Sequence, residues 1–211
     1  MTQIFLYGVQ CTPAVWEALK PYLPDQDAIF VEYPHTVTQQ AVSVSNITRW
    51  VYANILDDLA VDALIGHSMG GVVALELAVN YHVPSNKVIL IETNLKPANA
   101  FYRNLMTDDH LAQYGEQVLA MLQSEAPFYS APFKESLQAG FDFTDLVRCC
   151  PAPVHAIYGD RGVQSYAKRI SDLNLNADLV DRIGFHFVPD ACHMPMIENP
   201  AGLAKILAAL I

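Results

Sequence analysis

The sequence GHSMGG at residues 66–71 constrains this chain more than any other stretch. An apolar run precedes it and a longer one follows it, which is the setting of a G-x-S-x-G turn between a buried strand and a helix. Such a turn needs small residues on both sides of the serine, because side chains there would collide with the adjacent backbone. It exposes the Ser68 hydroxyl at the positive end of a helix. We therefore treat Ser68 as a candidate nucleophile; the alternative is a glycine-rich turn with an incidental serine.

Short apolar runs alternate with amphipathic stretches along the chain. The predicted strands lie at residues 4–7, 28–33, 63–65, 88–91, 154–158 and 185–188. This alternation predicts an α/β fold with a mostly parallel sheet of about six strands and helices on both faces. We also expect one helix from about residue 13 to 23, a loop at 34–44, a helix at 165–173 and a closing helix at 200–210. The length of 211 residues and the 52% hydrophobic content favour a single domain over residues 1–211.

The alternation stops between residues 93 and 146, where no convincing strand is found. This segment is rich in aromatic residues and prolines and contains helical stretches. Because insertions of this size are usually functional, we interpret it as a small helical cap over the site. Helices that merely cover the core are the alternative.

Three residues that suit nucleophilic catalysis follow predicted strands. Ser68 follows the third strand, Asp160 the fifth and His193 the last, and ligand sites of parallel sheets lie beyond such strand ends. His193 can accept the proton of the Ser68 hydroxyl, and Asp160 can orient the imidazole. Glu92, at the end of the fourth strand, competes with Asp160 for this role. Asp190 is a weaker candidate.

Two backbone N–H groups are expected to form an oxyanion hole. These belong to Met69, directly after the nucleophile, and to Val9, in the loop after the first strand. Gly8 would let that loop approach the substrate closely. Cys11 lies in the same loop, but the sequence suggests no paired histidine for it.

Charge and cysteine content exclude several classes of function. The formal net charge of −10 disfavours nucleic acid or an anionic membrane surface as a partner. No apolar run is long enough to span a membrane, and the N-terminal residues do not resemble a signal peptide. The spacing of the four cysteines fits no zinc pattern. We expect a cytoplasmic protein with reduced thiols, no metal and no cofactor.

Four blocks of sequence resemble the α/β-hydrolase superfamily, in its small esterase-like branch. They are YGV at 7–9 with Trp16, GHSMGG at 66–71, YGDR at 158–161 and HMPMIENP at 193–200. The resemblance spans nearly the whole chain, and the order Ser, Asp, His is the one expected of that fold. It departs at Tyr7, where the family usually has histidine, and at EYPHT, residues 32–36, where a glycine-rich loop is usual. The chain also begins at the strand that is normally third, so no antiparallel leading hairpin is expected.

The resemblance implies a serine hydrolase that cleaves an ester, thioester or amide through an acyl-enzyme. The aromatic residues of the expected cap suggest a small, apolar substrate. Two other classes remain open. One is a lyase or cofactor-independent oxygenase, since this fold carries both kinds of chemistry; the other is a non-catalytic small-molecule receptor. The sequence leaves the oligomeric state open.

Overall fold

A six-stranded sheet organises the protein, as predicted. The computed structural model describes residues 2–24, 27–56, 59–138 and 140–211. The strands are β1 (Thr2–Leu6), β2 (Ala28–Phe30), β3 (Val61–His67), β4 (Lys87–Ile91), β5 (Val154–Gly159) and β6 (Ile183–Val188). Their order is β2-β1-β3-β4-β5-β6, and every neighbouring pair is parallel. The strands consist mostly of apolar residues because helices cover both faces of the sheet.

The register brings the carboxyl ends of four strands to one edge of the sheet. His67 pairs with Ile91, which in turn pairs with Ile157, and Gly159 pairs with Val188. The loops that follow β3, β4, β5 and β6 therefore open on the same side. This edge is where the predicted site residues were expected to meet.

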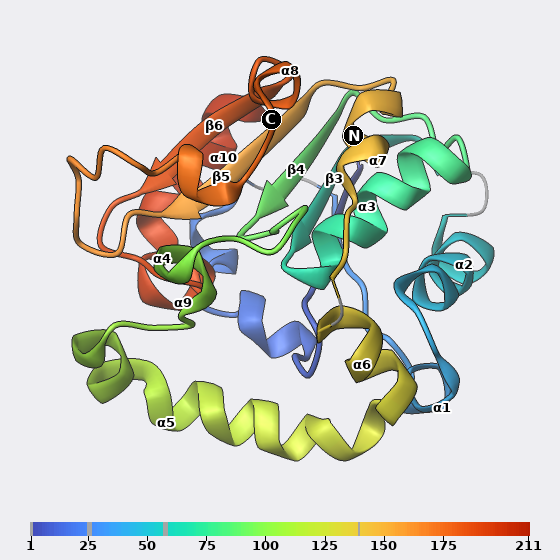
Figure 1. Ribbon diagram of the computed structural model, residues 1–211. Coiled ribbons are helices and arrows are strands. Elements are labelled where there is room, and N and C mark those ends of the chain that lie inside the picture. The colour runs from blue at the N-terminus through green and yellow to red at the C-terminus, as the bar shows by residue number, and fades with distance from the viewer. Residues whose placement is uncertain (1, 25–26, 57–58, 139) are drawn as a thin grey trace.

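Helices cover the sheet on both sides (Figure 1). Helices α2 (Val44–Ile55), α3 (Met69–Asn80) and α7 (Thr144–Cys149) pack together on one face, while α9 (Pro195–Glu198) and α10 (Pro200–Leu210) lie with the N-terminal turns on the other. The first ten residues of α3 are all buried, so this helix is apolar all round and forms the centre of the core. Its one buried carboxylate, Glu76, accepts hydrogen bonds from Ser45 and Thr48 of α2.

The described residues of the segment at 93–146 form helices joined by loops, with no strand among them; residue 139 lies outside the described residues. The segment contains α4 (Ala100–Arg103), α5 (Asp108–Glu125), η3 (Ala126–Phe128), α6 (Ala131–Gln138) and the first half of α7. Figure 1 shows α5 running across the edge at which the strands end. The remaining short helices are η4 (Ser171–Leu173) and α8 (Ala177–Val180).

Three local predictions were wrong. The helix expected at 13–23 is two short turns, η1 (Pro13–Trp16) and η2 (Lys20–Tyr22), because Pro21 lacks the N–H that a continuous helix needs. The loop expected at 34–44 contains α1 (His35–Gln40). Its buried residue, Thr38, donates a hydrogen bond to the carbonyl oxygen of Phe128. Because a polar contact holds this helix, its sequence lacks the apolar periodicity by which a helix is predicted.

The third wrong prediction concerns residues 165–173, which form turns that end in η4 instead of a helix. Tyr166 stacks on Phe101, with ring centroids 4.0 Å apart, and its hydroxyl donates to Asp172 at 2.5 Å. These tertiary contacts hold the segment in a turn conformation. No helix in the described part of the chain has the length and apolar character required to cross a membrane.

Candidate active site

Ser68 lies on a sharp turn between β3 and α3. Its φ of 52° and ψ of −120° are unusual for a residue with a side chain. The turn fits only because its neighbours are glycines: a Cβ on Gly66 would meet the Gly70 carbonyl group, and one on Gly70 would meet the Leu6 carbonyl group. The Ser68 N–H donates to the Ile91 carbonyl oxygen at 2.8 Å. The hydroxyl is thus presented at the first turn of α3.

His193 lies in the loop that follows β6, and backbone contacts fix its position. Its N–H donates to the Leu105 carbonyl oxygen at 3.0 Å, and its carbonyl oxygen lies 2.9 Å from Nε2 of His67. Burial and, less strongly, the neighbouring His193 lower the pKa of His67 to about 3, against weaker opposing effects. His67 is therefore neutral near pH 7, and Nε2 carries the proton because a carbonyl oxygen can only accept.

Glu92, the residue after β4, contacts the His193 imidazole. The distance from His193 Nδ1 to Glu92 Oε2 is 3.3 Å. Since an ionised carboxylate only accepts hydrogen bonds, this contact places the His193 proton on Nδ1 and leaves Nε2 as the basic nitrogen. Glu92 has a φ of 48° and is 1% exposed. The carboxylate is therefore held in a fixed, dry position behind the imidazole.

Arg161 holds the same carboxylate from the other side. Its Nη2 lies 2.9 Å from Glu92 Oε2, its Nη1 lies 3.1 Å from Oε1, and the Gly159 N–H donates to Oε1 at 2.6 Å. Burial alone would raise the pKa of Glu92, but the Arg161 charge and the hydrogen bonds from His193 and Arg161 outweigh it and hold that pKa below its usual value. Glu92 is therefore ionised at neutral pH.

Asp160 does not contact His193 among the hydrogen bonds of the described residues. Its Oδ1 accepts hydrogen bonds from the backbone N–H groups of Gly162 at 2.9 Å and Asp190 at 2.7 Å. Asp160 thus ties the loop after β5 to the loop after β6. The arrangement differs from the expectation that Asp160 orients the imidazole, because Glu92, on the strand next to that of Ser68, occupies the position behind the imidazole.

A cavity of about 210 Å³ lies where these loops meet. Its lining residues are Val9, Ser68, Met69, Val72, Glu92, Asn94, Leu137, Phe141, Phe143 and His193. Three of the apolar walls, Leu137, Phe141 and Phe143, come from the 93–146 segment. A larger cavity of about 550 Å³ lies near the amino ends of β3 and β4. It contains neither Ser68 nor His193, so the smaller cavity is the candidate substrate site.

The two expected oxyanion donors, Val9 and Met69, both line this cavity. Met69 is the first residue of α3, so its N–H has no acceptor within the helix. The loop of Val9 approaches closely because Gly8 lacks a side chain: a Cβ there would lie 3.0 Å from the Ser68 Cβ. Cys11, in the same loop, is buried, and burial raises the pKa of its thiol to about 12. A thiolate nucleophile is therefore disfavoured at that position.

Asn94 is the polar residue that the cavity adds beyond those expected. Its Oδ1 is buried and has no hydrogen-bond partner among the described residues. An unpartnered buried amide oxygen costs about 1–3 kcal/mol. A ligand that donates a hydrogen bond to Asn94 Oδ1 would remove this cost, so this oxygen is available to bind a ligand beside Ser68.

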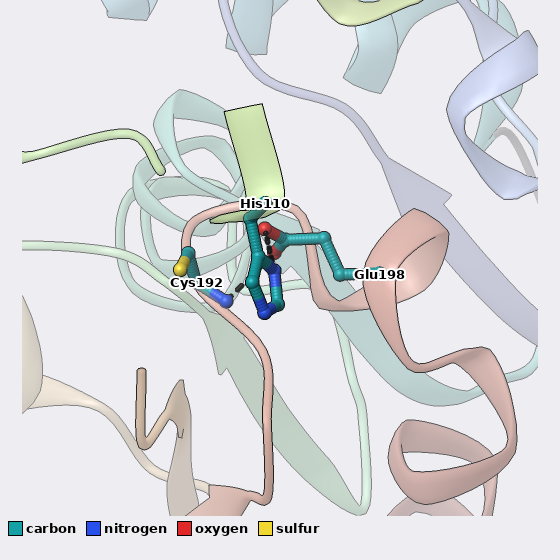
Figure 2. A group of neighbouring side chains, drawn as sticks. All are labelled: His110, Cys192 and Glu198. Atoms are coloured by element: carbon teal, nitrogen blue, oxygen red, sulfur yellow. Dashed lines mark hydrogen bonds and ion pairs between the residues drawn. The ribbon is translucent and has the colours of Figure 1, made fainter. Parts of the chain in front are cut away.

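A second cluster ties the His193 loop to α5 (Figure 2). His110 Nδ1 lies 2.8 Å from Glu198 Oε1, and Glu198 Oε2 accepts from the N–H groups of Cys192 at 2.7 Å and Met194 at 3.0 Å. The ligand atoms of His110, Cys192 and Glu198 lie within 4.8 Å of one another, as in a metal site. Each already has a partner, since the Cys192 thiol donates to Thr107. These contacts tie the His193 loop to α5.

Sequence reasoning missed three of these contributors. Arg161 is the last residue of the block YGDR, and Glu198 lies within the block HMPMIENP, but neither block by itself indicates a role for these two residues. His110 stood in an ordinary helical stretch and gave no signal. Arg161 lies 69 residues from its partner Glu92, and His110 lies 88 residues from its partner Glu198, so neither pairing is visible in the local sequence.

Comparisons with known proteins agree with this architecture. The sequence matches the model of the alpha/beta hydrolase family over residues 32–206. None of the curated proteins matches it. A solved thermophilic esterase from Thermogutta terrifontis is similar, with a TM-score of 0.78 and 19% identity, and the match covers 100% of this chain and 89% of the esterase.

Other solved structures are similar as well. The enol-lactonase from Burkholderia xenovorans LB400 has a TM-score of 0.69 and 17% identity, with 99% of this chain and 90% of the lactonase covered. A thioesterase domain from the curacin biosynthetic pathway has a TM-score of 0.65 and 15% identity, and the match covers 99% of this chain and 90% of the thioesterase domain. At these identities the structural likeness shows the fold, while the family match extends over most of the sequence. The chain therefore belongs to the alpha/beta hydrolase family.

Proposed function

We propose that the protein is a serine hydrolase that cleaves an ester, thioester or amide bond through an acyl-enzyme. Ser68 would act as the nucleophile, His193 as the base and Glu92 as the acid that orients it. The observation that carries this assignment is the contact between His193 Nδ1 and Glu92 Oε2 beside a cavity that also contains Ser68. It leaves Nε2 of His193 free to accept the serine proton.

The reaction would proceed in two halves. In the first, Ser68 Oγ attacks the substrate carbonyl carbon while His193 Nε2 takes the hydroxyl proton. The N–H groups of Val9 and Met69 would stabilise the resulting oxyanion, and His193 would return the proton to the leaving group. In the second half, His193 activates a water that attacks the acyl-enzyme. Release of the acid restores the free Ser68 hydroxyl.

We further propose that residues 93–146 act as a cap that selects a small acyl group. The cavity volume of about 210 Å³ is below the range of about 300–1,000 Å³ typical of sites for drug-sized ligands. Apart from Asn94 and the proposed catalytic groups, its walls are apolar or aromatic. A short, apolar acyl chain fits these walls, and long chains exceed the available volume.

Labelling with a fluorophosphonate tests the nucleophile directly. The wild type and the control variant Ser165→Ala, which changes an exposed serine, are expected to label with one probe per chain, whereas Ser68→Ala is not. Equal labelling of Ser68→Ala would overturn the assignment. Hydrolysis of p-nitrophenyl acetate by the wild type but not by Ser68→Ala is the second expected result. Labelling without hydrolysis of any ester, thioester or amide would favour a receptor.

A further inference from the structure

Arg161 is more deeply buried than an ordinary surface arginine. Its side chain is 4% exposed, and that of Glu92 is 1% exposed. Besides the two hydrogen bonds to Glu92, Nη1 donates to the Gly159 carbonyl oxygen at 2.9 Å. The guanidinium carbon lies 4.8 Å from the ring centroid of Tyr102. Burying a cation in this way is costly unless a carboxylate pairs with it, so the two residues form one unit.

The backbone conformations of Glu92 and Arg161 also indicate that these two residues form one unit. Glu92 has a φ of 48° and Arg161 a φ of 54°. Left-handed conformations are uncommon for residues with these side chains and cost free energy. Glu92 directly follows β4 and Arg161 lies two residues after β5, and the two side chains meet in a fork-to-fork contact. Backbone strain and a desolvated ion pair are thus concentrated at one point behind His193.

Besides His193, the titratable groups His67, Tyr102, Tyr158 and Cys192 face this pair, and these four are neutral near pH 7. Burial lowers the pKa of His67 to about 3 and raises the pKa values of Tyr102 and Tyr158 above their usual range. Burial also raises the pKa of the Cys192 thiol to about 11. Among the described groups that interact with Glu92, the Arg161 guanidinium therefore supplies the permanent positive charge.

We propose that Arg161 is a positioning residue that acts through Glu92 and sets how tightly the Glu92–His193 pair holds a proton. This inference rests on the proposed function. Without Arg161, an uncompensated buried carboxylate would bind a proton itself or would strengthen the hold of His193 on one. In either case the pair would keep its proton to higher pH, and His193 would be a free base over a narrower range. The fork also aims Oε2 at Nδ1.

Charge and geometry can be separated by two substitutions at position 161. Arg161→Met removes both, whereas Arg161→Lys keeps the charge and loses the fork. In Arg161→Met we expect the acidic limb of the pH profile of kcat/KM to move up by about one unit, and kcat at neutral pH to fall about tenfold or more. KM is expected to change little, because Arg161 does not line the cavity.

The lysine variant is expected to keep the acidic limb of the wild type and to lose part of kcat. Arg49→Met, which removes the same charge from the exposed side of α2, should match the wild type in both respects. If Arg161→Met loses kcat while its pH profile superimposes on that of the wild type, the role is structural only and the proposal is wrong. An unchanged lysine variant would show that the fork contributes nothing.

A second measurement does not depend on hydrolysis. NMR titration of the His193 imidazole, assigned by comparison with His193→Gln, should move to higher pH in Arg161→Met and not in Arg49→Met. If the methionine variant does not fold, the His193 titration can be compared between Arg161→Lys, which keeps the positive charge, and Arg161→Gln, which removes it. If the wild type hydrolyses no ester but the titration shifts in Arg161→Met, the proposed function is wrong, whereas the effect of Arg161 on the Glu92–His193 pair is confirmed. An unshifted titration would refute the inference alone.

Discussion

Nε2 of His67 lies 2.9 Å from the carbonyl oxygen of His193, so the last residue of β3 holds the loop after β6 in place. His67 directly precedes Ser68. One imidazole thus links the turn that carries the candidate nucleophile to the loop that carries the candidate base. The ring is neutral because burial disfavours its charged form, which outweighs the opposite effect of this hydrogen bond.

The burial of the His67 ring predicts a pH-dependent contribution to stability. The folded-state pKa of His67, about 3, lies below its unfolded value of 6.5, so the unfolded chain binds more protons between these values. Stability from His67 is present above pH 6.5 and is lost as the pH falls towards 3. In His67→Gln, whose amide can still donate to the loop, the free energy of unfolding should fall less steeply than in the wild type between pH 6.5 and 4. Urea unfolding at several pH values measures this, and parallel curves would contradict it.

The two strand-end carboxylates are expected to respond differently to amide substitution. Glu92→Gln replaces a carboxylate that can only accept with an amide that can also donate, so the His193 tautomer is no longer fixed. The value of kcat should fall by roughly 10³-fold or more, as when the acid of a triad is amidated. Asp160→Asn should leave kcat within about tenfold and lower thermal stability, because the loop contacts to Gly162 and Asp190 weaken. Measuring kcat of both variants on a short ester decides which carboxylate orients His193. A larger kcat loss in Asp160→Asn would return the orienting role to that residue.

The aromatic wall of the cavity should set the upper limit of acyl length. Phe143 stacks on Phe141, with ring centroids 5.5 Å apart, and both line the cavity. We expect Phe143→Ala to raise kcat/KM for octanoate esters relative to acetate esters by about tenfold. Tyr22→Ala, an exposed aromatic outside the cavity, is the control and should leave the ratio unchanged. A wild type that already prefers long chains would contradict the size argument.

The tie between His110 and Glu198 predicts an opposite pH dependence. Burial alone would lower the pKa of His110, but hydrogen bonds and charge from Glu198 and Asp190 outweigh it and raise that pKa. Its stabilising contribution is therefore complete below about pH 6.5 and is lost as the pH rises through the raised folded-state value. The difference in unfolding free energy between the wild type and His110→Gln should be larger at pH 6 than at pH 9.

Glu198→Ala should be more harmful than His110→Gln, because it also leaves the N–H groups of Cys192 and Met194 without their acceptor. We expect a loss of about 2–4 kcal/mol in unfolding free energy. Asp190→Asn is the matched control, since the Asp190 side chain is 82% exposed and its contact should contribute little. Equal losses in the two acidic-residue variants would argue against a buried tie.

The strands and the turn at Ser68 could be predicted because their cause is local. Apolar runs such as those of β3 and β4 are buried along their length, and glycine spacing around Ser68 reflects close approach within one turn. The choice between Asp160 and Glu92 could not be made locally. Asp160 and Glu92 each directly follow one of two adjacent strands. Which of the two carboxylates reaches His193 depends on the left-handed φ values of Glu92 and Arg161 and on the ion pair between these residues. None of these leaves a periodic signal in the sequence.

The pairing of β4 with β5 also bears on how the protein folds. Residues 92–153 separate these two parallel strands, so joining them closes a loop of about sixty residues, which is slow compared with forming a helix. The hydrogen bonds from Gly159 and Arg161 to Glu92 span that same loop. They form only once it closes. Recovery of esterase turnover after dilution from denaturant should therefore lag behind recovery of the helical circular dichroism signal.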